Sequence, residues 1–462
     1  MSKILVFNVP AHGHVNPTLP VVRELVSRGE QVAYYLTDEF ESQIRHTGAE
    51  FRRIEDTQSG SGPPPGVTTM GQTDPAMVRQ MMAAFFPRMM ADGLRRVPEL
   101  VDRARPEDAD CVVYDPFCPW GRALVAILGL PAVAFVPSYA MTENFPLVRR
   151  LSALFEEETS PEAEEAMSDF QDVSRQLHDR YGLIPLRITD PFTSAEALNI
   201  VTLPRAFQPD ADTLDERYVF VGPSISPRSD ASGFPLDRLA DNPTLYVSLG
   251  TVFNANSEFF GACFDAFADS DWQVVLSVGA RTESSTLARI PANFLVRPHV
   301  PQLEVLEHTD VFVTHGGMNS VMEAIYYGVP MVLVPQQPEQ AMTAARVAEL
   351  GLGVALEPGQ VTAGPLRDAV ATVSGDPGYR SRIAHVQRAA RDAGGYLHAA
   401  DVIQQFGHRQ IREKGAKPKN QDRDTGGMPP SGGDIGKRRG GGGICATVWQ
   451  QHDQGIPASR LI

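Results

Sequence analysis

Short apolar runs alternate with stretches of helical periodicity along most of the chain. The first run, Ile4–Val9, is mostly apolar and rich in β-branched residues, the pattern of a parallel strand that is covered on both faces. Apolar residues then recur at helical spacing from Leu19 to Val26, and Arg28 and Gly29 end that helix. The repeated order of strand and helix predicts an α/β protein with parallel sheets.

The predicted strands fall into two groups, separated by a stretch rich in Pro, Ser and Asp from Gly222 to Asn242. A chain of 462 residues is longer than one ordinary domain. We therefore expect two doubly wound domains, 1–223 and 244–406, joined by a linker at 224–243. The expected strands are Ile4–Val9, Gln31–Leu36, Cys111–Asp115, Ala132–Val136 and Leu198–Leu203 in the first domain, and Leu245–Leu249, Gln273–Val278, Phe294–Arg297, Val311–Thr314 and Met331–Val334 in the second.

The last part of the chain, 407–462, has a different composition. It is rich in glycine and has ten Lys and Arg residues against five Asp and Glu residues. Such a segment has too few apolar residues for a core, so it predicts a disordered, solvated tail. The basic run Lys437–Arg439 leaves a contact with nucleic acid or lipid as the alternative. We expect a chain ending at Phe406 to keep its activity.

Charge and composition exclude several classes of partner. The formal net charge of −15 argues against a nucleic acid or an anionic membrane as partner of the folded part. No apolar run approaches the roughly 20 residues that a membrane span needs, and the chain enters a strand without a signal peptide. The four cysteines lack zinc-site spacing. We therefore expect a cytoplasmic protein without stable membrane insertion.

The segment from Asp310 to Glu323 has the features of an anion site. A short apolar strand runs into His315, Gly316 and Gly317, and a helix follows. The start of a helix offers free N–H groups and positive potential, and glycine lets a diphosphate approach the backbone. Glu323, one turn into the helix, could accept hydrogen bonds from a ribose. The alternative is a capping box formed by Ser320 and Glu323.

A second group of candidate residues follows two strands of the first domain. His14 lies in the turn after the first strand, and Asp115 ends the strand that begins at Cys111. Carboxyl ends of parallel strands meet at one edge of a sheet, so the acid could orient the imidazole there. His12 shares the turn and is expected to support it through hydrogen bonds. The alternative is that His14 has a purely structural role.

The region Thr69–Arg96 is rich in methionine and aromatic residues. Helical core packing explains this composition. The alternative is an adaptable wall for a bulky hydrophobic substrate, because methionine side chains adjust to irregular shapes. Acid-rich faces between Leu147 and Leu183 indicate solvated helices.

The spaced series Pro301-Gln302, His315-Gly316-Gly317, Gly328-Val329-Pro330 and Pro338-Glu339-Gln340 resembles the nucleotide-sugar signature of the family 1 glycosyltransferases. Within that family, the turn His12–Pro17 is most similar to the bacterial macrolide glycosyltransferases. The resemblance covers nearly all of 3–406. It implies the GT-B fold, in which two Rossmann-like, doubly wound domains face each other across a cleft, with the acceptor on the first and the donor on the second.

The resemblance also implies the role of each candidate residue. His14 would be the general base and Asp115 its partner. The diphosphate would lie on the His315 turn, the ribose on Glu323 and the sugar hydroxyls on Glu339 and Gln340. The donor-binding residues would be Ser248, Gly250, Thr251, His299, Val300, Gln302, His315, Gly317, Met318, Asn319, Ser320, Glu323, Glu339 and Gln340.

One departure from the plant pattern leaves the donor open. His299 stands where the plant enzymes have a tryptophan that stacks on uracil. The implied reaction is an inverting transfer of a sugar, with UDP-glucose favoured, to a hydroxyl of a macrolide or a similar polyketide or flavonoid acceptor. The alternative is a biosynthetic transfer of a deoxysugar such as mycarose from a dTDP donor. A minor alternative is a nucleotide-sugar epimerase or binding subunit. Because a helix terminus can stabilise the diphosphate, no metal and no cofactor beyond the nucleotide sugar are expected.

Overall fold

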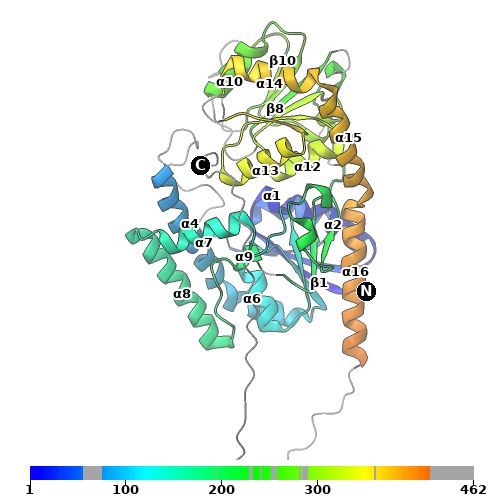
Figure 1. Cartoon of the computed structure of the whole chain (residues 1–462). Coiled ribbons are helices and arrows are strands. Elements are labelled where there is room, and N and C mark those ends of the chain that lie inside the picture. The colour runs from blue at the N-terminus through cyan, green and yellow to red at the C-terminus, as the bar shows by residue number, and fades with distance from the viewer. Residues whose placement is uncertain are drawn as a thin grey trace, which may run out of the picture. The chain divides into compact units, whose positions relative to one another are not determined.

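The computed structural model describes residues 1–55, 75–193, 195–227, 233–239, 242–250, 257–279, 282, 290–357 and 361–416. These residues form two parallel β-sheets with helices packed against them (Figure 1). The first sheet has the order β3-β2-β1-β4-β5-β6-β7 and the second the order β10-β9-β8-β11-β12-β13. In each sheet the strand order reverses once, between β1 and β4 and between β8 and β11. Such a reversal is where open α/β sheets bind ligands.

The first sheet is covered on both faces. Alternate residues of β1 point to opposite sides: Ile4 and Val6 pack with α2 and α16, and Leu5 and Phe7 pack with α4, α5 and α6. This explains the unbroken apolar runs of the central strands. Its strands are β1 (Lys3–Phe7), β2 (Gln31–Leu36), β3 (Glu50–Arg53), β4 (Cys111–Tyr114), β5 (Ala132–Val136), β6 (Leu198–Val201) and β7 (Tyr218–Phe220), and its helices are α1 (His12–Val15), α2 (Thr18–Ser27), α3 (Glu41–His46), α4 (Pro75–Arg95), α5 (Val97–Ala104), α6 (Pro119–Leu128), α7 (Pro146–Glu157), α8 (Pro161–Tyr181) and α9 (Asp190–Thr193).

The second sheet follows the same rule. Tyr246 and Phe312 stack on one face beneath α12, and Leu245 and Val311 pack on the other face with α10 and α14. Its strands are β8 (Thr244–Ser248), β9 (Gln273–Ser277), β10 (Phe294–Arg297), β11 (Val311–Thr314), β12 (Met331–Leu333) and β13 (Gly353–Ala355), and its helices are α10 (Ser257–Phe267), α11 (Gln302–Leu306), α12 (Met318–Tyr327), α13 (Pro338–Glu349), α14 (Ala363–Gly375) and α15 (Pro377–Asp392). The last helix of the chain is α16 (Gly395–Ala416).

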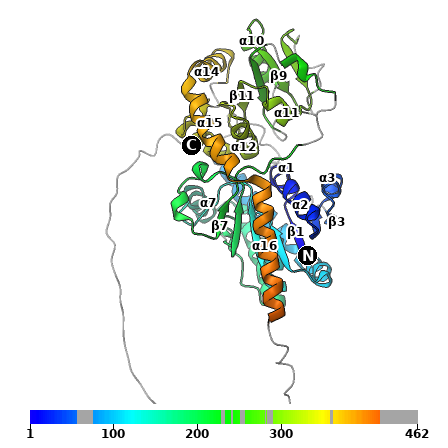
Figure 2. The ribbon, with the colours of Figure 1, turned by 90° about the vertical axis from the view of Figure 1, so that its right-hand side faces the viewer.

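The last helix returns to the first sheet and is longer than expected. α16 runs beside α2 and β1 (Figure 2), where Ile403 and Phe406 join the core of the first sheet. It continues through Gly407, the position at which we placed the start of the tail, and ends at Ala416. A Cβ on residue 407 would lie 3.1 Å from Ser2 Oγ, so glycine here permits close packing of the helix and does not end it. The predicted tail beyond Ala416 lies outside the described residues.

Three strands were not predicted from the sequence: β3, β7 and β13. Each lies at the edge of its sheet and has only three or four residues. Edge strands are half solvated and short, so they lack the apolar run that marks a central strand. The described residues contain no helix with the length and apolar character needed to cross a bilayer.

Candidate active site

The imidazole of His14 and the carboxylate of Asp115 meet at the carboxyl edge of the first sheet. His14 lies in α1, just after β1, and Asp115 follows β4, so both lie where the strand order reverses. His14 Nδ1 is 2.7 Å from Asp115 Oδ2. Asp115 is buried, and its Oδ1 accepts a hydrogen bond from the Phe117 N–H at 2.8 Å. With Nδ1–H donating to Asp115, Nε2 is the nitrogen that can accept a proton.

The turn that carries His14 is held by a buried amide. Asn8 Nδ2 donates to the His14 carbonyl and to the Tyr34 hydroxyl, each at 3.0 Å. His12 is placed differently: its Nε2 lies 3.5 Å from a Glu39 carboxylate oxygen, away from Asp115. The two histidines of the turn therefore have separate partners, and His14 is the one that meets a buried acid.

Electrostatics favours the protonated form of His14. Burial lowers the pKa of His14, but the charge of Asp115, its hydrogen bond and the charge of Glu339 together raise it above the ordinary value. Glu339 is exposed at the start of α13. Desolvation by the protein around it raises the pKa of its carboxyl group, and the charge of His14 lowers that pKa by less. The two side chains thus interact electrostatically although they follow strands of different sheets.

His315 lies at the corresponding edge of the second sheet, between two glycines. It follows β11, and Gly250 follows the neighbouring strand β8, with Thr314 and Ser248 paired in the ladder. A Cβ on Gly250 would lie 2.6 Å from His315 Cε1, and one on Gly317 would lie 2.4 Å from Nε2. Only glycine leaves room for the ring at both positions. Burial lowers the pKa of His315 to about 4, so the ring is neutral, and its Nδ1 has no partner among the described residues.

The N-terminus of α12 is free of a side-chain cap. Gly317 is the N-cap residue, and no side chain accepts a hydrogen bond from the first turn. The unsatisfied N–H groups and the helix dipole favour an anion at this position. Ser320 is the third residue of the helix and not its N-cap, so the capping-box alternative is wrong. Its Oγ is 3.4 Å from Gln302 Nε2.

Glu323 belongs to a buried polar network one turn further along α12. Gln302 Nε2 donates to Glu323 Oε2 at 2.5 Å, and the Tyr246 hydroxyl donates to Gln302 Oε1 at 3.0 Å. Tyr246 in turn stacks on Phe312 with 4.6 Å between ring centres. These contacts fix the orientation of the carboxylate before any ligand arrives.

The other predicted donor residues differ in how far their side chains are available for contact with a ligand. The Val300 side chain is buried in the core, and Met318 packs against that core, so only their main chains are candidates for ligand contacts. His299 is exposed. Ser248 Oγ accepts a hydrogen bond from the Gly250 N–H at 3.3 Å and thereby shapes the turn after β8. Thr251 lies outside the described residues.

The loop before α13 contains a further candidate for ligand binding, Gln336, that was not predicted from the sequence. Gln340 is buried; its Oε1 accepts from the Gln336 N–H at 2.8 Å, and its Nε2 donates to Gln337 Oε1 at 3.5 Å. The Gln336 side chain is 7% exposed, and neither its Oε1 nor its Nε2 has a partner among the described residues. A buried amide without partners costs roughly 1–3 kcal/mol. Nothing in the sequence distinguishes Gln336 from the next glutamine.

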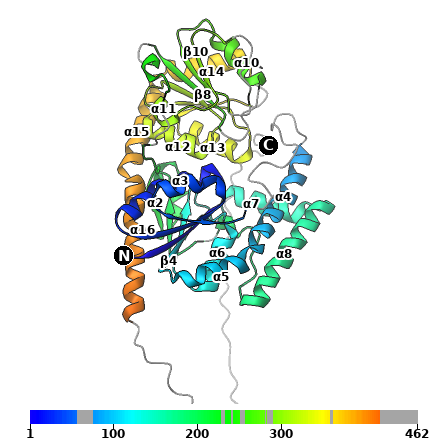
Figure 3. The ribbon, with the colours of Figure 1, turned by 180° about the vertical axis from the view of Figure 1, so that it is seen from behind.

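Asn319 connects the two groups of residues. Its Nδ2 donates to the Gly13 carbonyl at 3.0 Å, one residue before His14. In Figure 1, α1 lies directly below α12 and α13, and Figure 3 shows α12 and α13 from the opposite side. The second amide proton and the amide oxygen of Asn319 are not used by this bond, so contact with a diphosphate is compatible with it.

No group of three or more His, Cys, Asp or Glu side chains in the described part of the chain is arranged to hold a metal ion. Three Asp-x-Asp sequences occur there, at 108–110, 210–212 and 269–271. Asp110 accepts a hydrogen bond from the Lys3 N–H at the start of β1, and Asp271 precedes β9. These two pairs therefore lie at the amino ends of strands, the opposite edge from His14 and His315.

Comparisons with known proteins agree with this arrangement. Residues 240–396 match the family described as UDP-glucoronosyl and UDP-glucosyl transferase. The NDP-glycosyltransferase YjiC of Bacillus licheniformis is 39% identical over 413 residues, covering 87% of this chain and 97% of that protein. The demethyllactenocin mycarosyltransferase of Streptomyces fradiae is 33% identical over 408 residues, covering 87% and 86% respectively. The crystal structure of CalG4, the calicheamicin glycosyltransferase, has a TM-score of 0.73 at 34% identity and covers 88% of this chain and 99% of that one.

The two sheets, with a polar site at each reversal of strand order, therefore define a GT-B protein of two Rossmann-like domains. The chain belongs to the family 1 glycosyltransferases and is an enzyme that transfers sugars from nucleotide-sugar donors.

Proposed function

We propose that this enzyme transfers a hexose from UDP-glucose to a hydroxyl of a macrolide or a related hydrophobic acceptor, with inversion at the anomeric carbon. The observation that carries the proposal is the placement of His14 and His315 at the two strand-order reversals, joined through the Asn319–Gly13 hydrogen bond. This connection supports the proposal, because it would allow the proposed base and the proposed anion site to act on one donor.

The proposed chemistry begins at His14. Nε2 takes the proton of the acceptor hydroxyl as its oxygen attacks the anomeric carbon, and Asp115 stabilises the imidazolium that forms. The bond from the anomeric carbon to the diphosphate oxygen breaks, and its electron pair leaves with the nucleoside diphosphate. A single displacement from the opposite face inverts the configuration, so no enzyme nucleophile is required.

The departing diphosphate gains negative charge, and the proposed site for it is the N-terminus of α12. The main-chain N–H groups after Gly317, together with the neutral His315 ring, can donate to its oxygens. These groups can stabilise the charge that develops without a bound metal, so we propose a metal-independent reaction. Glu323 and Gln302 would hold the ribose, and Glu339, Gln340 and Gln336 would face the sugar hydroxyls.

The second candidate is transfer of a deoxysugar from a dTDP donor. It is supported by the mycarosyltransferase among the relatives and by the exposed His299 in place of a stacking tryptophan. Family membership and the His14–Asp115 pair argue against the non-transferase alternative, because a binding subunit has no use for a base beside the donor site.

The test is a donor panel. Purified enzyme is incubated with macrolide acceptors and either UDP-glucose or dTDP-activated sugars, with EDTA present or absent, and the products are identified by mass. We expect a hexose-sized gain from UDP-glucose that persists in EDTA. His14→Ala should lower the rate roughly 10²–10⁴-fold, whereas His12→Ala, which changes the same turn without touching Asp115, should lower it much less. A product from dTDP-deoxysugars alone would support the second candidate, and equal losses in the two variants would contradict the role of His14.

A further inference from the structure

A series of aromatic rings leads away from the proposed base. The ring of Phe117 lies edge-on to His14, with 5.5 Å between their centres. Phe117 contacts Phe192 at 5.1 Å, Phe192 stacks on Phe86 at 5.3 Å, and Phe86 stacks on Phe155 at 5.7 Å. The series crosses from the edge of the first sheet to α9, α4 and α7, so packed aromatic rings connect His14 with these helices.

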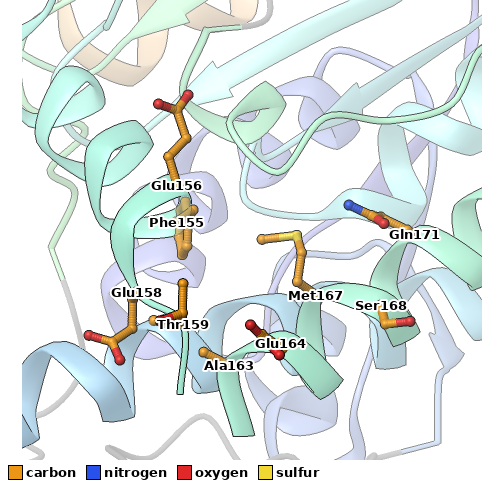
Figure 4. Close-up of a pocket in the computed structure, with 10 residues that line it drawn as sticks. Phe155, Glu156, Glu158, Thr159, Ala163, Glu164, Met167, Ser168 and Gln171 are labelled. Carbon is orange, nitrogen blue, oxygen red and sulfur yellow. The ribbon is translucent and has the colours of Figure 1, made fainter. Parts of the chain in front are cut away.

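Two adjoining cavities lie at the far end of this series, among α4, α7, α8 and the segment before α9. The larger has a volume of about 510 Å³ and the smaller about 270 Å³. They adjoin along Phe155, Glu156, Met167 and Gln171, which line both, and we call the two cavities together the hollow. In the smaller cavity, Phe155 and Met167 point towards each other across the space (Figure 4). Ala83, from the methionine-rich helix α4, also lines it.

The walls of the hollow carry an excess of negative charge. The smaller cavity is lined by Glu156, Glu158 and Glu164 and by no basic residue. In Figure 4, Glu164 lies beside Met167, while Glu156 and Glu158 point outward at the rim. The larger cavity contains one basic side chain, Arg187, which is already paired with Glu143 at 3.0 Å.

We propose that this hollow receives the part of the acceptor remote from the reacting hydroxyl and selects acceptors with a protonated amine on an apolar body. In this proposal the aromatic series links the hollow to His14, Phe155 and Met167 contact the apolar body, and the glutamates attract the cation. The inference rests on the proposed function, since it takes His14 as the position of the reacting hydroxyl. A volume of several hundred cubic ångströms suits a group the size of a sugar or a short side arm.

The first experiment compares one hydrophobic polycyclic alcohol that carries a primary amine with its N-acetylated form. Binding of each to the enzyme is measured by calorimetry without donor, and kcat/KM is measured with donor, at low and high salt. We expect the amine to be preferred about fivefold, the effect of a partly exposed ion pair, and the preference to shrink at high salt. Glu156→Gln combined with Glu164→Gln should remove it.

Glu162→Gln is the matched control for the Glu164 change. Both glutamates are exposed in the first turn of α8 and both interact with its dipole, but only Glu164 lines the hollow. Equal affinity for amine and amide, or an amine preference that survives the double variant, overturns the inference. Turnover without amine preference would overturn it while leaving the proposed function intact. Amine-selective binding with no turnover from any donor would support the inference about the hollow and overturn the proposed function.

A larger side chain in the hollow tests whether the acceptor occupies that space. Met167→Trp should lower kcat/KM at least fivefold for the large acceptor while leaving it nearly unchanged for a small phenol that fits beside His14 and Phe117. An equal effect on both acceptors, or no effect on either, would contradict placement of the acceptor in the hollow. Circular dichroism and the thermal midpoint verify that the variant is folded.

Discussion

The Asn319 side chain donates a hydrogen bond to the Gly13 carbonyl, and this bond joins the start of α12 to the turn that carries His14. The two residues are separated by 306 positions in the chain. One amide thereby connects the proposed diphosphate site to the proposed base. We infer that Asn319 positions His14 relative to the donor, in addition to any contact with the diphosphate.

Replacing Asn319 should therefore affect turnover more than nucleotide binding. Loss of one hydrogen bond is worth about 0.5–1.5 kcal/mol, so Asn319→Ala should lower kcat roughly 2- to 13-fold with a smaller change in the Kd of UDP. Asn319→Asp keeps the shape but has no N–H donor, and it should be at least as damaging. Steady-state kinetics and calorimetry provide the two numbers.

Ser320→Ala is the comparison for this prediction. Its hydroxyl belongs to the same helix end but bonds to Gln302 within the second domain. If Asn319 acts only as a diphosphate ligand, its variants will weaken UDP binding by the same factor by which they lower kcat/KM. Ser320→Ala should show that same pattern. Equal factors for the Asn319 variants would rule out the positioning role.

The pH dependence of the reaction should depend on Glu339. The negative charge of Glu339 contributes to the raised pKa of His14, and a base must be unprotonated to act. The acidic limb of kcat/KM should therefore lie above the ordinary histidine value. Glu339→Gln removes the charge, lowers the pKa of His14 and moves that limb to lower pH. Glu349→Gln, at the far end of α13, should leave the limb in place.

The position of the limb, and not the height of the profile, is the relevant measurement, because Glu339 is also a proposed sugar contact. A shift to higher pH, or an equal shift in Glu349→Gln, would show that Glu339 does not act on His14. A rate loss at all pH values with an unchanged limb would leave only the sugar contact.

The Gln336 side chain should lower the stability of the free enzyme and raise kcat/KM for the donor. Its buried amide has no partner among the described residues, so Gln336→Met, which keeps the shape without the polar atoms, should leave the free energy of unfolding unchanged or raise it by about 1 kcal/mol. The same change should lower kcat/KM for the donor. Urea titration and kinetics test the two effects. The neighbouring Gln337→Met should show no such opposition between stability and activity, and a Gln336→Met enzyme of full activity would remove the residue from the site.

The sequence was sufficient to predict the central strands and both groups of polar residues. Buried parallel strands produce unbroken apolar runs, and the polar residues that matter follow those runs directly, as His14, Asp115 and His315 do. The edge strand β3 was missed because Glu50 and Arg53 face solvent. Gly407 was misread as the end of the fold because its close packing on Ser2 is a tertiary contact. The Asn319–Gly13 bond and the aromatic series are likewise products of the folded chain and leave no local signal.

The extra turns of α16 change what a truncation should do. Glu30, which directly precedes β2, is almost completely buried and is hydrogen-bonded to residues near the start of the chain and in α16. It accepts hydrogen bonds from the Ser2 main chain and hydroxyl, from Gln404 Nε2 at 2.7 Å and from His408 Nε2 at 2.8 Å. Burial raises the pKa of Glu30, but these bonds outweigh it and lower the pKa to about 2.

A carboxyl group whose pKa is lower in the folded state stabilises the fold above its unfolded pKa of about 4.5 and loses that contribution as the pH falls towards 2. At about 1.4 kcal/mol per pKa unit, this difference corresponds to roughly 3 kcal/mol. Glu30→Gln should therefore destabilise the enzyme at pH 7 by about that amount and near pH 2.5 by only about a quarter of it, which urea denaturation at the two pH values measures. A chain ending at Phe406 lacks His408 and should lose part of the same contribution to stability, whereas one ending at Ala416 should keep it together with full activity. Equal destabilisation by Glu30→Gln at both pH values would show that the network acts through packing and not through the ionised carboxylate.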